Sequence, residues 1–354
     1  MGYQIDFLPV GDKGRSGDAI AMRFGNLYGD RSEQTIILID GGFKNTAPTI
    51  INHLDTHYGT DRIDLVVSTH PDGDHINGLL VVVDELKVDE LWMHRPSTQR
   101  RMIELALSAL GEHEYRTAVA SALDTAEELE DLALQKGITI QEPFTGLTHT
   151  SGSYFVLGPS EGFYQQLFRE PTLEEEQRGL LRSVAGVLGE YVGRVAESLN
   201  IETLTDEGIT TPLNNSSAVT MLKDNGDLLL FTSDAGITAL SQVADVLESQ
   251  GFVPPQLKFI QVPHHGSRRN VGPSVLDRLL GTRLVTEKEL GVAYVSCAPD
   301  GEPKHPAKKV TNAFRRRGAP VHATKGTPNL HHRNAPDRGW SPSVPLPLFP
   351  EVDD

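Results

Sequence analysis

Four side chains that can bind a metal ion stand within the stretch "STHPDGDH" (residues 68–75), directly after the apolar run "IDLVV". They are His70, Asp72, Asp74 and His75. Pro71 and Gly73 are incompatible with a regular helix through the whole stretch, so we expect a turn on which these side chains converge. Neutral imidazole and carboxylate groups are ligands for Zn²⁺, Mn²⁺ or Fe²⁺. The stretch therefore predicts a metal centre at the end of a strand.

A second cluster of the same design is "VPHHGS", in which His264 and His265 follow another apolar run. Two acids also end apolar runs, Asp40 in "IILIDGG" and Asp234 in "LLLFTSD". If these strands lie side by side, their ends share one edge and the side chains meet there. The repeated pattern favours a metal centre over a solvated Asp-Gly turn with incidental histidines. It does not give the number of metal ions.

The rest of the sequence predicts an α/β protein in which two strand-rich parts flank a helical middle. Short runs typical of strands dominate residues 1–95 and return in the second half of the chain. Apolar residues at spacings of three and four predict helical insertions at about 98–136 and 161–205. We expect one domain over residues 1–330, followed by an extended, proline-rich tail over 331–354.

Composition limits the partners that the protein can have. The chain has 354 residues, of which 38% are hydrophobic and 23% charged, as is typical of a globular protein. Its net charge of −16 opposes broad coating of DNA, so a nucleic acid has to be held by local basic residues or bound metal ions. The single cysteine, Cys297, suits a reducing compartment. The sequence shows neither a signal peptide nor a run of about 18 apolar residues, so we expect a cytoplasmic protein without a membrane partner.

Seven motifs resemble those of the metallo-β-lactamase-fold hydrolases, and among these the hydrolase domain of the ComEC type found with bacterial DNA-uptake channels. They occur in the family's order and span most of residues 1–326. The resemblance implies an αββα four-layer sandwich with a metal site along one edge between two sheets. The motifs are "IDGG" (39–42), "STHPDGDHINGL" (68–79), "YFVLGPS" (154–160), "NNSSAV" (214–219), "LLLFTSD" (228–234), "VPHHGS" (262–267) and "KHP" (304–306).

The resemblance also implies a role for each metal-competent residue. His70 and Asp72 face one ion, Asp74 and His75 face the second, Asp234 bridges them, and a histidine of the pair His264 and His265 completes the second site. Asp40 is expected beneath the histidines, where it fixes the orientation of a ring. Asn215 is expected close to the ligands without binding the metal.

The chain departs from the commonest family pattern at two points. Asp72 replaces the usual second histidine of the first motif, and "NNSS" (214–217) stands where another ligand histidine is usual. Fewer imidazoles and more oxygen donors favour a harder ion such as Mn²⁺ over Zn²⁺, or a weakly held first ion. We expect two divalent ions per chain, Mn²⁺ or Zn²⁺, while one ion or none stays open. His149, shortly before a predicted strand, is an alternative source of the missing imidazole.

Two such ions would generate a bound hydroxide near neutral pH and neutralise charge on an ester or phosphodiester oxygen. We therefore predict a metal-dependent hydrolase, with a phosphodiesterase or nuclease favoured through the ComEC resemblance. Asp74 or Asp234 would orient the hydroxide, and His305 would protonate the leaving oxygen. Ser267 is not the nucleophile, because no Gly-x-Ser-x-Gly elbow surrounds it. The residues expected to contact the substrate are Ser267, Arg268 and Lys304.

Several alternatives remain at the level of the sequence. The run Arg315–Arg317 either binds phosphate or ends a helix, where cations are favoured by the helix dipole. A hydrolase of a non-phosphate ester, thioester or lactam usually keeps the full imidazole set, so Asp72 and "NNSS" count against it. An interaction module that has lost its chemistry has no need of so many desolvated ionisable groups. The helical insertions would form a lid, a homo-oligomer interface or a docking surface for a protein, or would only cover a sheet.

Overall fold

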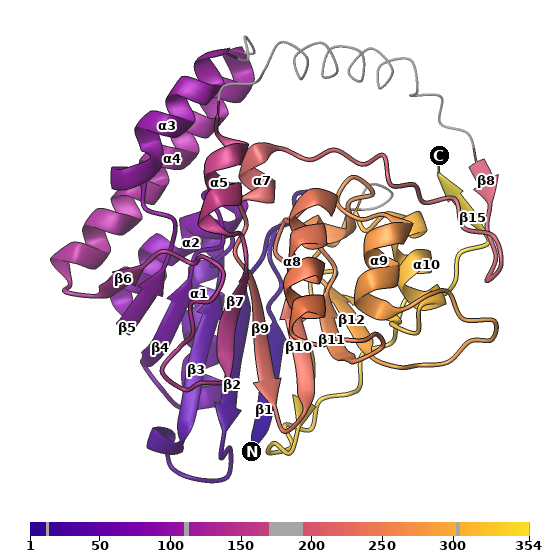
Figure 1. Cartoon of the computed structure of the whole chain (residues 1–354). Helices are drawn as coiled ribbons and strands as arrows, with labels where there is room; N and C mark the ends of the chain where they lie inside the picture. The colour runs from indigo at the N-terminus through magenta and orange to yellow at the C-terminus, as the bar shows by residue number, and fades with distance from the viewer. Residues whose placement is uncertain (12–13, 110–112, 170–193, 302–304, 354) are drawn as a thin grey trace.

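The protein folds as two β-sheets that face each other, with helices on both outer faces (Figure 1). This four-layer arrangement confirms the predicted αββα sandwich with helical insertions. The computed structural model describes residues 1–11, 14–109, 113–169, 194–301 and 305–353.

The first sheet has seven strands in the order β14-β1-β2-β3-β4-β5-β6. Strands β3 to β6 run parallel, whereas β1 is antiparallel to both of its neighbours. Apolar runs such as "TIILI" in β3 are expected for parallel strands that are covered on both faces. The strands are β1 (Gly2–Phe7), β2 (Ile20–Gly25), β3 (Gln34–Ile39), β4 (Arg62–Val67), β5 (Lys87–Trp92), β6 (Thr139–Gln141) and β14 (Asn329–Arg333).

The second sheet has six strands in the order β13-β12-β11-β10-β9-β7. Strands β10 to β13 run parallel, and β9 is antiparallel to β7 and β10. The turn between β9 and β10 has positive φ angles at Asn225 and Gly226, as a tight hairpin requires. The strands are β7 (Tyr154–Gly158), β9 (Val219–Asp224), β10 (Asp227–Phe231), β11 (Leu257–Gln261), β12 (Val292–Val295) and β13 (Val321–Ala323). A separate pair consists of β8 (Arg194–Ala196) and β15 (Glu351–Asp353).

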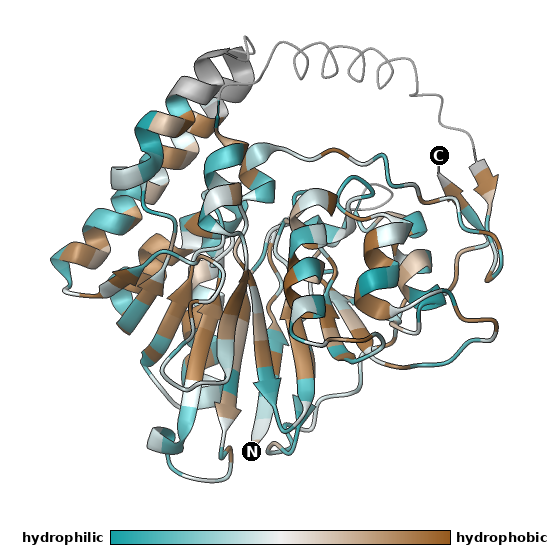
Figure 2. Cartoon of the chain, viewed as in Figure 1, coloured by the Kyte–Doolittle hydropathy of each residue, from teal (hydrophilic) through white to brown (hydrophobic). Residues whose placement is uncertain are grey.

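Helices α1, α2 and α4 cover the first sheet, and α8, α9 and α10 cover the second. Figure 2 shows the hydrophobic residues concentrated in the strands and on the helices beside them. Among the helices of the described ranges, none is both long and apolar enough to cross a membrane. The helices are α1 (Ala47–His53), α2 (Gly73–Glu85), α3 (Pro96–Ala109), α4 (His113–Gln135), α5 (Glu161–Leu167), α7 (Pro212–Asn215), α8 (Ile237–Ser249), α9 (Pro273–Leu280) and α10 (Lys308–Arg316).

The space between the two sheets is filled by a hydrophobic core of its own. Alternate residues of β1, Tyr3, Ile5 and Phe7, belong to this core, as the period of a strand dictates. The ring centroid of Phe259 lies 5.8 Å from that of Phe7 and 5.5 Å from that of Phe231. The contact with Phe7 joins the two sheets, whereas Phe231 and Phe259 are neighbours within the second sheet.

The first predicted insertion consists of helices α3 and α4. Ile103 of α3 joins a small core with Tyr164 of α5 and Leu213 of α7. The second predicted insertion, 161–205, begins with α5, but its residues 170–193 lie outside the described residues. This small core packs the first insertion against α7, and α7 in turn lies beside the candidate ligand His264.

The C-terminal residues return to the first sheet, where β14 pairs antiparallel with β1. Further along, Arg338 binds the buried carboxylate of Asp6, and the backbone N–H of Phe349 donates to Asn312 of α10. The boundary that the sequence suggested at residue 330 falls inside β14. The proline-rich residues beyond it run from the first sheet to the helices that cover the second.

Candidate metal centre

Four strands end at one edge of the sandwich. Strands β3 and β4 are parallel neighbours in the first sheet, and β10 and β11 are parallel neighbours in the second. The residues that follow these strands therefore gather at a common edge. They are Asp40 after β3, His70 after β4, Asp234 after β10, and His264 and His265 after β11.

Helix α2 supplies further candidate ligands. The sequence suggested a turn through "STHPDGDH", whereas the helix begins at Gly73 and carries Asp74 and His75 in its first turn. Asp72 is the N-cap residue, but its side chain makes no capping hydrogen bond. Proline and glycine disfavour the interior of a helix much more than its start, which is why this short stretch allows both conformations. The carboxylate of Asp72 is thus not engaged in capping the helix.

Glycines allow α2 to approach the loop after β3. The backbone N–H of Gly78 donates to the carbonyl oxygen of Gly42 at 2.9 Å. A Cβ atom on Gly78 would lie 1.9 Å from the carbonyl oxygen of Gly41, so only glycine fits there. This close contact places His75 next to Asp40.

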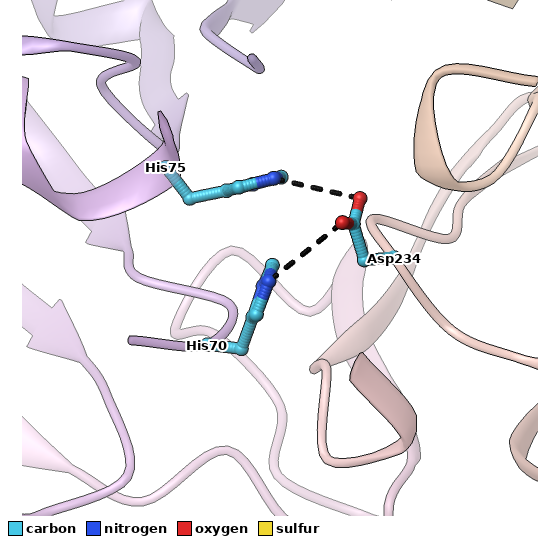
Figure 3. A group of neighbouring side chains, drawn as sticks. All are labelled: His70, His75 and Asp234. Carbon is cyan, nitrogen blue, oxygen red and sulfur yellow. Dashed lines mark ion pairs between the residues drawn. The ribbon is translucent and has the colours of Figure 1, made fainter. Parts of the chain in front are cut away.

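Asp234 stands between three imidazole rings. Its Oδ1 lies 3.5 Å from Nε2 of His75, and its Oδ2 lies 3.8 Å from Nε2 of His70 (Figure 3). Oδ2 also lies 3.4 Å from Nε2 of His264. The two oxygens of one carboxylate therefore face different rings, which suits a ligand shared by two ions.

Asp72 and Asp74 extend the cluster toward solvent. Oδ2 of Asp74 lies 3.4 Å from Nε2 of His265, and Oδ2 of Asp72 lies 3.5 Å from Nε2 of His70. The side chains of Asp72 and Asp74 are 35% and 30% exposed, so a water molecule or a substrate can reach this side. His264 and His70 both face Oδ2 of Asp234, whereas His265 faces Asp74.

The Nδ1 atoms of the four rings are held by hydrogen-bond acceptors. Nδ1 of His75 donates to Oδ2 of Asp40 at 2.8 Å, and Nδ1 of His265 donates to the carbonyl oxygen of Ser296 at 3.1 Å. A donating Nδ1 leaves the lone pair on Nε2. In their neutral form, both rings therefore present the lone pair of Nε2 to the cluster, where it can bind a metal ion.

The other two rings have the same tautomer for different reasons. Nδ1 of His70 lies 3.1 Å from the hydroxyl of Thr69, which donates to Asp40 and so accepts from the ring. Nδ1 of His264 lies 2.9 Å from Oδ1 of Asn270 and 3.1 Å from Nδ2 of Asn214, and the nearer contact favours the same tautomer. The amide nitrogen of Asn270 donates to a backbone carbonyl at 2.8 Å, which turns its oxygen toward the ring. Sequence reasoning missed Asn270, because a single amide in a loop forms no recognisable pattern.

Buried atoms without partners test whether these residues fit a metal ion. Within the described residues, Nε2 of His70, His75 and His265 and Oδ1 of Asp234 are buried and have no hydrogen-bond partner. Such atoms cost free energy unless something satisfies them. A divalent cation among them would do so, and two groups of three, His70-His75-Asp234 and Asp74-His75-His265, have their ligand atoms close enough to hold one. The residues fit a metal centre.

Charges within the cluster shift the pKa values of its members. Burial would raise the pKa of Asp74, but His75 and His265 lower it to about 2. Burial would lower the pKa of His265, but the neighbouring carboxylates of Asp74 and Asp234 raise it to about 9. Burial also opposes the charge on His75, yet the surrounding carboxylates raise its pKa well above the ordinary value. A metal ion therefore replaces protons when it binds to these rings.

The loops that present the ligands have an uncommon backbone conformation. The φ angle is 56° at Asp40, 46° at Ser233, 48° at His264 and 54° at His265. Non-glycine residues rarely adopt positive φ angles, and they keep them where surrounding contacts enforce the conformation. At Ser233 the backbone N–H donates to Oε1 of Gln261 at 2.9 Å, which supports the turn before Asp234.

Asp18 is a further buried carboxylate at this edge, and the sequence reasoning did not find it. Its Oδ2 lies 4.0 Å from Nδ1 of His75 and accepts from Nε2 of Gln261 at 3.0 Å. Burial raises the pKa of Asp18, although His265 and His75 act in the opposite direction. Asp18 precedes β2, and because β2 is antiparallel to β3, the start of β2 lies where β3 ends. In the sequence, Asp18 is an acid that precedes an apolar strand, whereas Asp40 and Asp234 follow one.

The motif "KHP" supplied two candidate residues, His305 and Lys304, and the structure describes only the first. The ring of His305 lies 6.1 Å from that of His264 and 6.3 Å from that of His265, measured between centroids. His305 is thus at the rim of the cluster. Lys304 lies outside the described residues.

The remaining candidates surround the cluster. Ser267 is buried, and its hydroxyl accepts from the backbone N–H of Arg269 at 3.3 Å, whereas Arg268 is exposed. Asn215 is buried in α7. Its neighbour Asn214 is the residue of this motif that reaches a ligand, with Nδ2 at 3.1 Å from Nδ1 of His264.

Two groups considered from the sequence do not join the cluster. Arg316 and Arg317 are buried and bind acidic side chains, Arg316 with Glu197 at 2.8 Å. These arginines are occupied within the fold and do not offer a phosphate site. His149 lies before β7, with its Nδ1 at 3.0 Å from the hydroxyl of Ser151 in the same turn, so it does not replace the missing imidazole.

Residues 27–164 match the family model described as the metallo-beta-lactamase superfamily. This range contains strands β3 to β7 and the motif from His70 to His75. Over this range, which is less than half of the chain, the protein is similar to the metallo-beta-lactamase superfamily. The sequence matches none of the curated proteins with which it was compared.

Solved structures similar to this chain share little of its sequence. The hydrolase AbOPH of the beta lactamase superfamily is 12% identical, with a TM-score of 0.35 over 61% of this chain and 55% of that chain. A CmlA beta-hydroxylase mutant is 11% identical, with a TM-score of 0.44 over 94% of this chain and 54% of that chain. A long form RNase Z from yeast is 11% identical, with a TM-score of 0.35 over 83% of this chain and 37% of that chain. The chain spans about half the length of the first two proteins and less of the third.

Proposed function

We propose that the protein is a metal-dependent phosphodiesterase or nuclease. The observation that carries the proposal is the mixed ligand set, in which the carboxylates of Asp72, Asp74 and Asp234 contact the Nε2 atoms of four imidazoles. Such oxygen-rich sets suit Mn²⁺ as well as Zn²⁺. Paired metal ions serve phosphatases and nucleases. The resemblance of the motifs to the ComEC-type hydrolase domain supports the same substrate class.

We infer two ion positions from the contacts. The first would be held by His70, Asp72 and His264, the second by Asp74, His75 and His265, with Asp234 shared between them. When bound, two divalent ions activate a water molecule and neutralise the charge that develops on a phosphodiester oxygen.

Side chains of the protein would hold the water and move protons. The exposed face of Asp74 can accept a hydrogen bond from the attacking water, because its carboxylate stays ionised at neutral pH. His305 at the rim can protonate the leaving oxygen, a role that contributes typically about 10²- to 10⁴-fold to rates. Asp40 would keep the ring of His75 in the metal-binding tautomer throughout.

Basic residues beside the cluster support a phosphodiester substrate. Arg268 and Arg269 are exposed in the loop directly after the His264-His265 pair. Guanidinium groups bind phosphate oxygens through paired hydrogen bonds. They would hold a nucleic acid or a nucleotide against the unfavourable net charge of −16.

The helical insertion would form one wall of the substrate site. Leu213 of α7 packs with α3, α4 and α5, and the next residue, Asn214, contacts His264. This wall would limit the size of the substrate and offers a surface for a second copy of the chain or a protein partner.

The single cysteine supports a cytoplasmic location. Because Cys297 is buried and requires no oxidising environment, we propose that the protein acts in the cytoplasm.

The experiment that tests this function combines metal analysis with a turnover assay. The purified protein, reloaded with Mn²⁺ or Zn²⁺, should hydrolyse bis-p-nitrophenyl phosphate, and Asp74→Ala should not. Asp89→Ala, which removes an exposed carboxylate paired with Arg62, is the matched control and should behave like the wild type. Turnover of thioesters or lactones but not of phosphodiesters would support the second class of hydrolase. Metal-loaded protein without any turnover would favour the interaction module.

A further inference from the structure

We propose that Asp18 and Gln261 form a positioning pair for the metal centre. Asp18 would supply negative charge beneath the second ion position, and Gln261 would tie Asp18 to the turn that presents Asp234. This inference rests on the ion positions proposed above.

Asp18, Asp40 and His75 also have ligand atoms within reach of one another, but we infer that Asp18 supports a ligand and is not one itself. Its Oδ2 lies 4.0 Å from Nδ1 of His75, the nitrogen that already donates to Asp40. Nε2 of the same ring points to Asp234 at 3.5 Å. Asp18 and Asp40 thus flank the side of the ring that faces away from the ions.

The loop that carries Asp18 is pressed against the start of α2. The backbone N–H of Asp18 donates to the carbonyl oxygen of Asp74 at 3.2 Å. A Cβ atom on Gly17 would lie 2.4 Å from that same oxygen, so no larger residue fits without a shift. The position of Asp18 relative to Asp74 and His75 is therefore set by the backbone.

Gln261 connects this loop of the first sheet with a turn of the second. Its Oε1 accepts from the backbone N–H groups of Thr232 and Ser233 at 3.0 and 2.9 Å. Because backbone N–H groups only donate, the oxygen must face the turn, and Nε2 is left to donate to Oδ2 of Asp18 at 3.0 Å. One buried amide therefore holds Asp18 and the turn of positive φ before Asp234 in a fixed relation.

The free-energy cost of burying the carboxylate of Asp18 indicates its role. It is 1% exposed, and within the described part of the chain its Oδ1 has no hydrogen-bond partner. A buried carboxylate that is incompletely satisfied destabilises a fold. A cation bound nearby would offset this cost, so the charge of Asp18 should oppose the stability of the metal-free protein while it strengthens metal binding. A residue that serves the fold alone would have the opposite effect on stability.

The test uses Asp18→Asn, which keeps the shape and removes the charge. Mn²⁺ is titrated into the metal-free protein by calorimetry, and the thermal unfolding of the metal-free form is followed separately. We expect the affinity for one ion to fall by about 10- to 100-fold, as for other residues that orient ligands, while Tm is unchanged or raised. Unchanged affinity would overturn the proposal. A lower Tm or failure to fold would assign Asp18 a structural role and would overturn it as well.

Two further variants separate the charge from the hydrogen bond. Gln261→Leu should also weaken the affinity for Mn²⁺, and the double variant should lose less than the sum of the two single losses, because both act on the same turn. Strict additivity would refute the coupling. The matched control is Asp6→Asn, an equally buried carboxylate bound to His53 and Arg338, which should lower Tm and leave Mn²⁺ binding unchanged. Since these readouts need no substrate, they stay informative if the protein hydrolyses no phosphodiester.

Discussion

Oδ2 of Asp40 lies 2.8 Å from Nδ1 of His75, and this contact leaves Nε2 as the nitrogen that faces Asp74 and Asp234. The same carboxylate accepts from the backbone N–H and the hydroxyl of Thr69 at 2.9 and 2.8 Å. With three donors bound, the carboxylate is held in one orientation. Asp40 thus fixes the orientation of a ring that is a candidate metal ligand.

We expect Asp40→Ala to weaken metal binding by about 10- to 100-fold, because the ring of His75 can then rotate and change tautomer. Calorimetric titration of the metal-free protein with Mn²⁺ measures the change. Asp61→Ala, at an exposed carboxylate that pairs with Lys87, is the control and should bind like the wild type. Wild-type affinity in Asp40→Ala would contradict the role of this contact.

Removal of single ligands should reveal how many ions the centre holds. Asp234→Ala removes the carboxylate that three rings share, so we expect it to retain neither ion. His265→Ala should lose only the ion on the side of Asp74. Elemental analysis after dialysis distinguishes the two variants. Equal metal content in both would be inconsistent with a shared carboxylate.

Metal binding should depend on pH through the imidazoles. In the metal-free protein the pKa of His265 is raised from 6.5 to about 9. Because the folded-state pKa is raised, this ring stabilises the metal-free fold fully below about pH 6.5, and its contribution is lost as the pH rises through about 9. A cation must displace the proton, so the apparent affinity for Mn²⁺ should increase over the same range, by about tenfold per pH unit for each proton released.

Titrations in buffers of different ionisation enthalpy measure the number of protons released on metal binding. In His265→Ala this number should be smaller, and the dependence of affinity on pH should be weaker. A pH-independent affinity in the wild type would show that the ring is already neutral when the ion arrives.

The ion pair of Arg316 and Glu197 should contribute to the stability of the fold and not to substrate binding. Both side chains are fully buried, with 2.8 Å between Nη2 and Oε2. Arg316→Met leaves the carboxylate without its cationic partner, which typically costs about 3 to 5 kcal/mol of unfolding free energy. Urea unfolding measures this loss, while the metal content of the folded protein should stay unchanged.

Arg268→Ala provides the contrast to that variant, because Arg268 is exposed beside the metal centre. We expect KM for a phosphodiester to rise and Tm to stay constant, with a larger effect at low salt, where exposed charges are less screened. If KM is unchanged at low salt, Arg268 does not contact the substrate.

The sequence was sufficient to predict the fold and the edge at which the ligands gather. Asp40, His70, Asp234 and His264 each follow an apolar run, and the ends of neighbouring parallel strands lie together. The sequence could not decide the conformation around Gly73, because Pro71 and a glycine are tolerated both in a turn and at the first positions of a helix.

Residues that act across the two sheets could not be predicted. Asp18 lies at the centre because β2 is antiparallel to β3, and that pairing is not visible in the sequence. Gln261 joins loops from both sheets, and Asn270 acts through the ring of His264. Arg316 was ambiguous because its partner, Glu197, is 119 positions away. Asp18, Gln261 and Arg316 depend on contacts between distant residues, which no local pattern encodes, whereas Asn270 is a single amide six positions from His264.

Strand β14 has a consequence for the handling of this protein. It covers the outer edge of β1, so that Tyr3–Phe7 have a paired strand on both sides. A chain cut before Asn329 would leave that edge open, and an open, apolar edge strand pairs readily with other molecules. Shortened forms should therefore aggregate even when their metal ligands are intact. The last element to join the first sheet thus keeps neighbouring molecules apart.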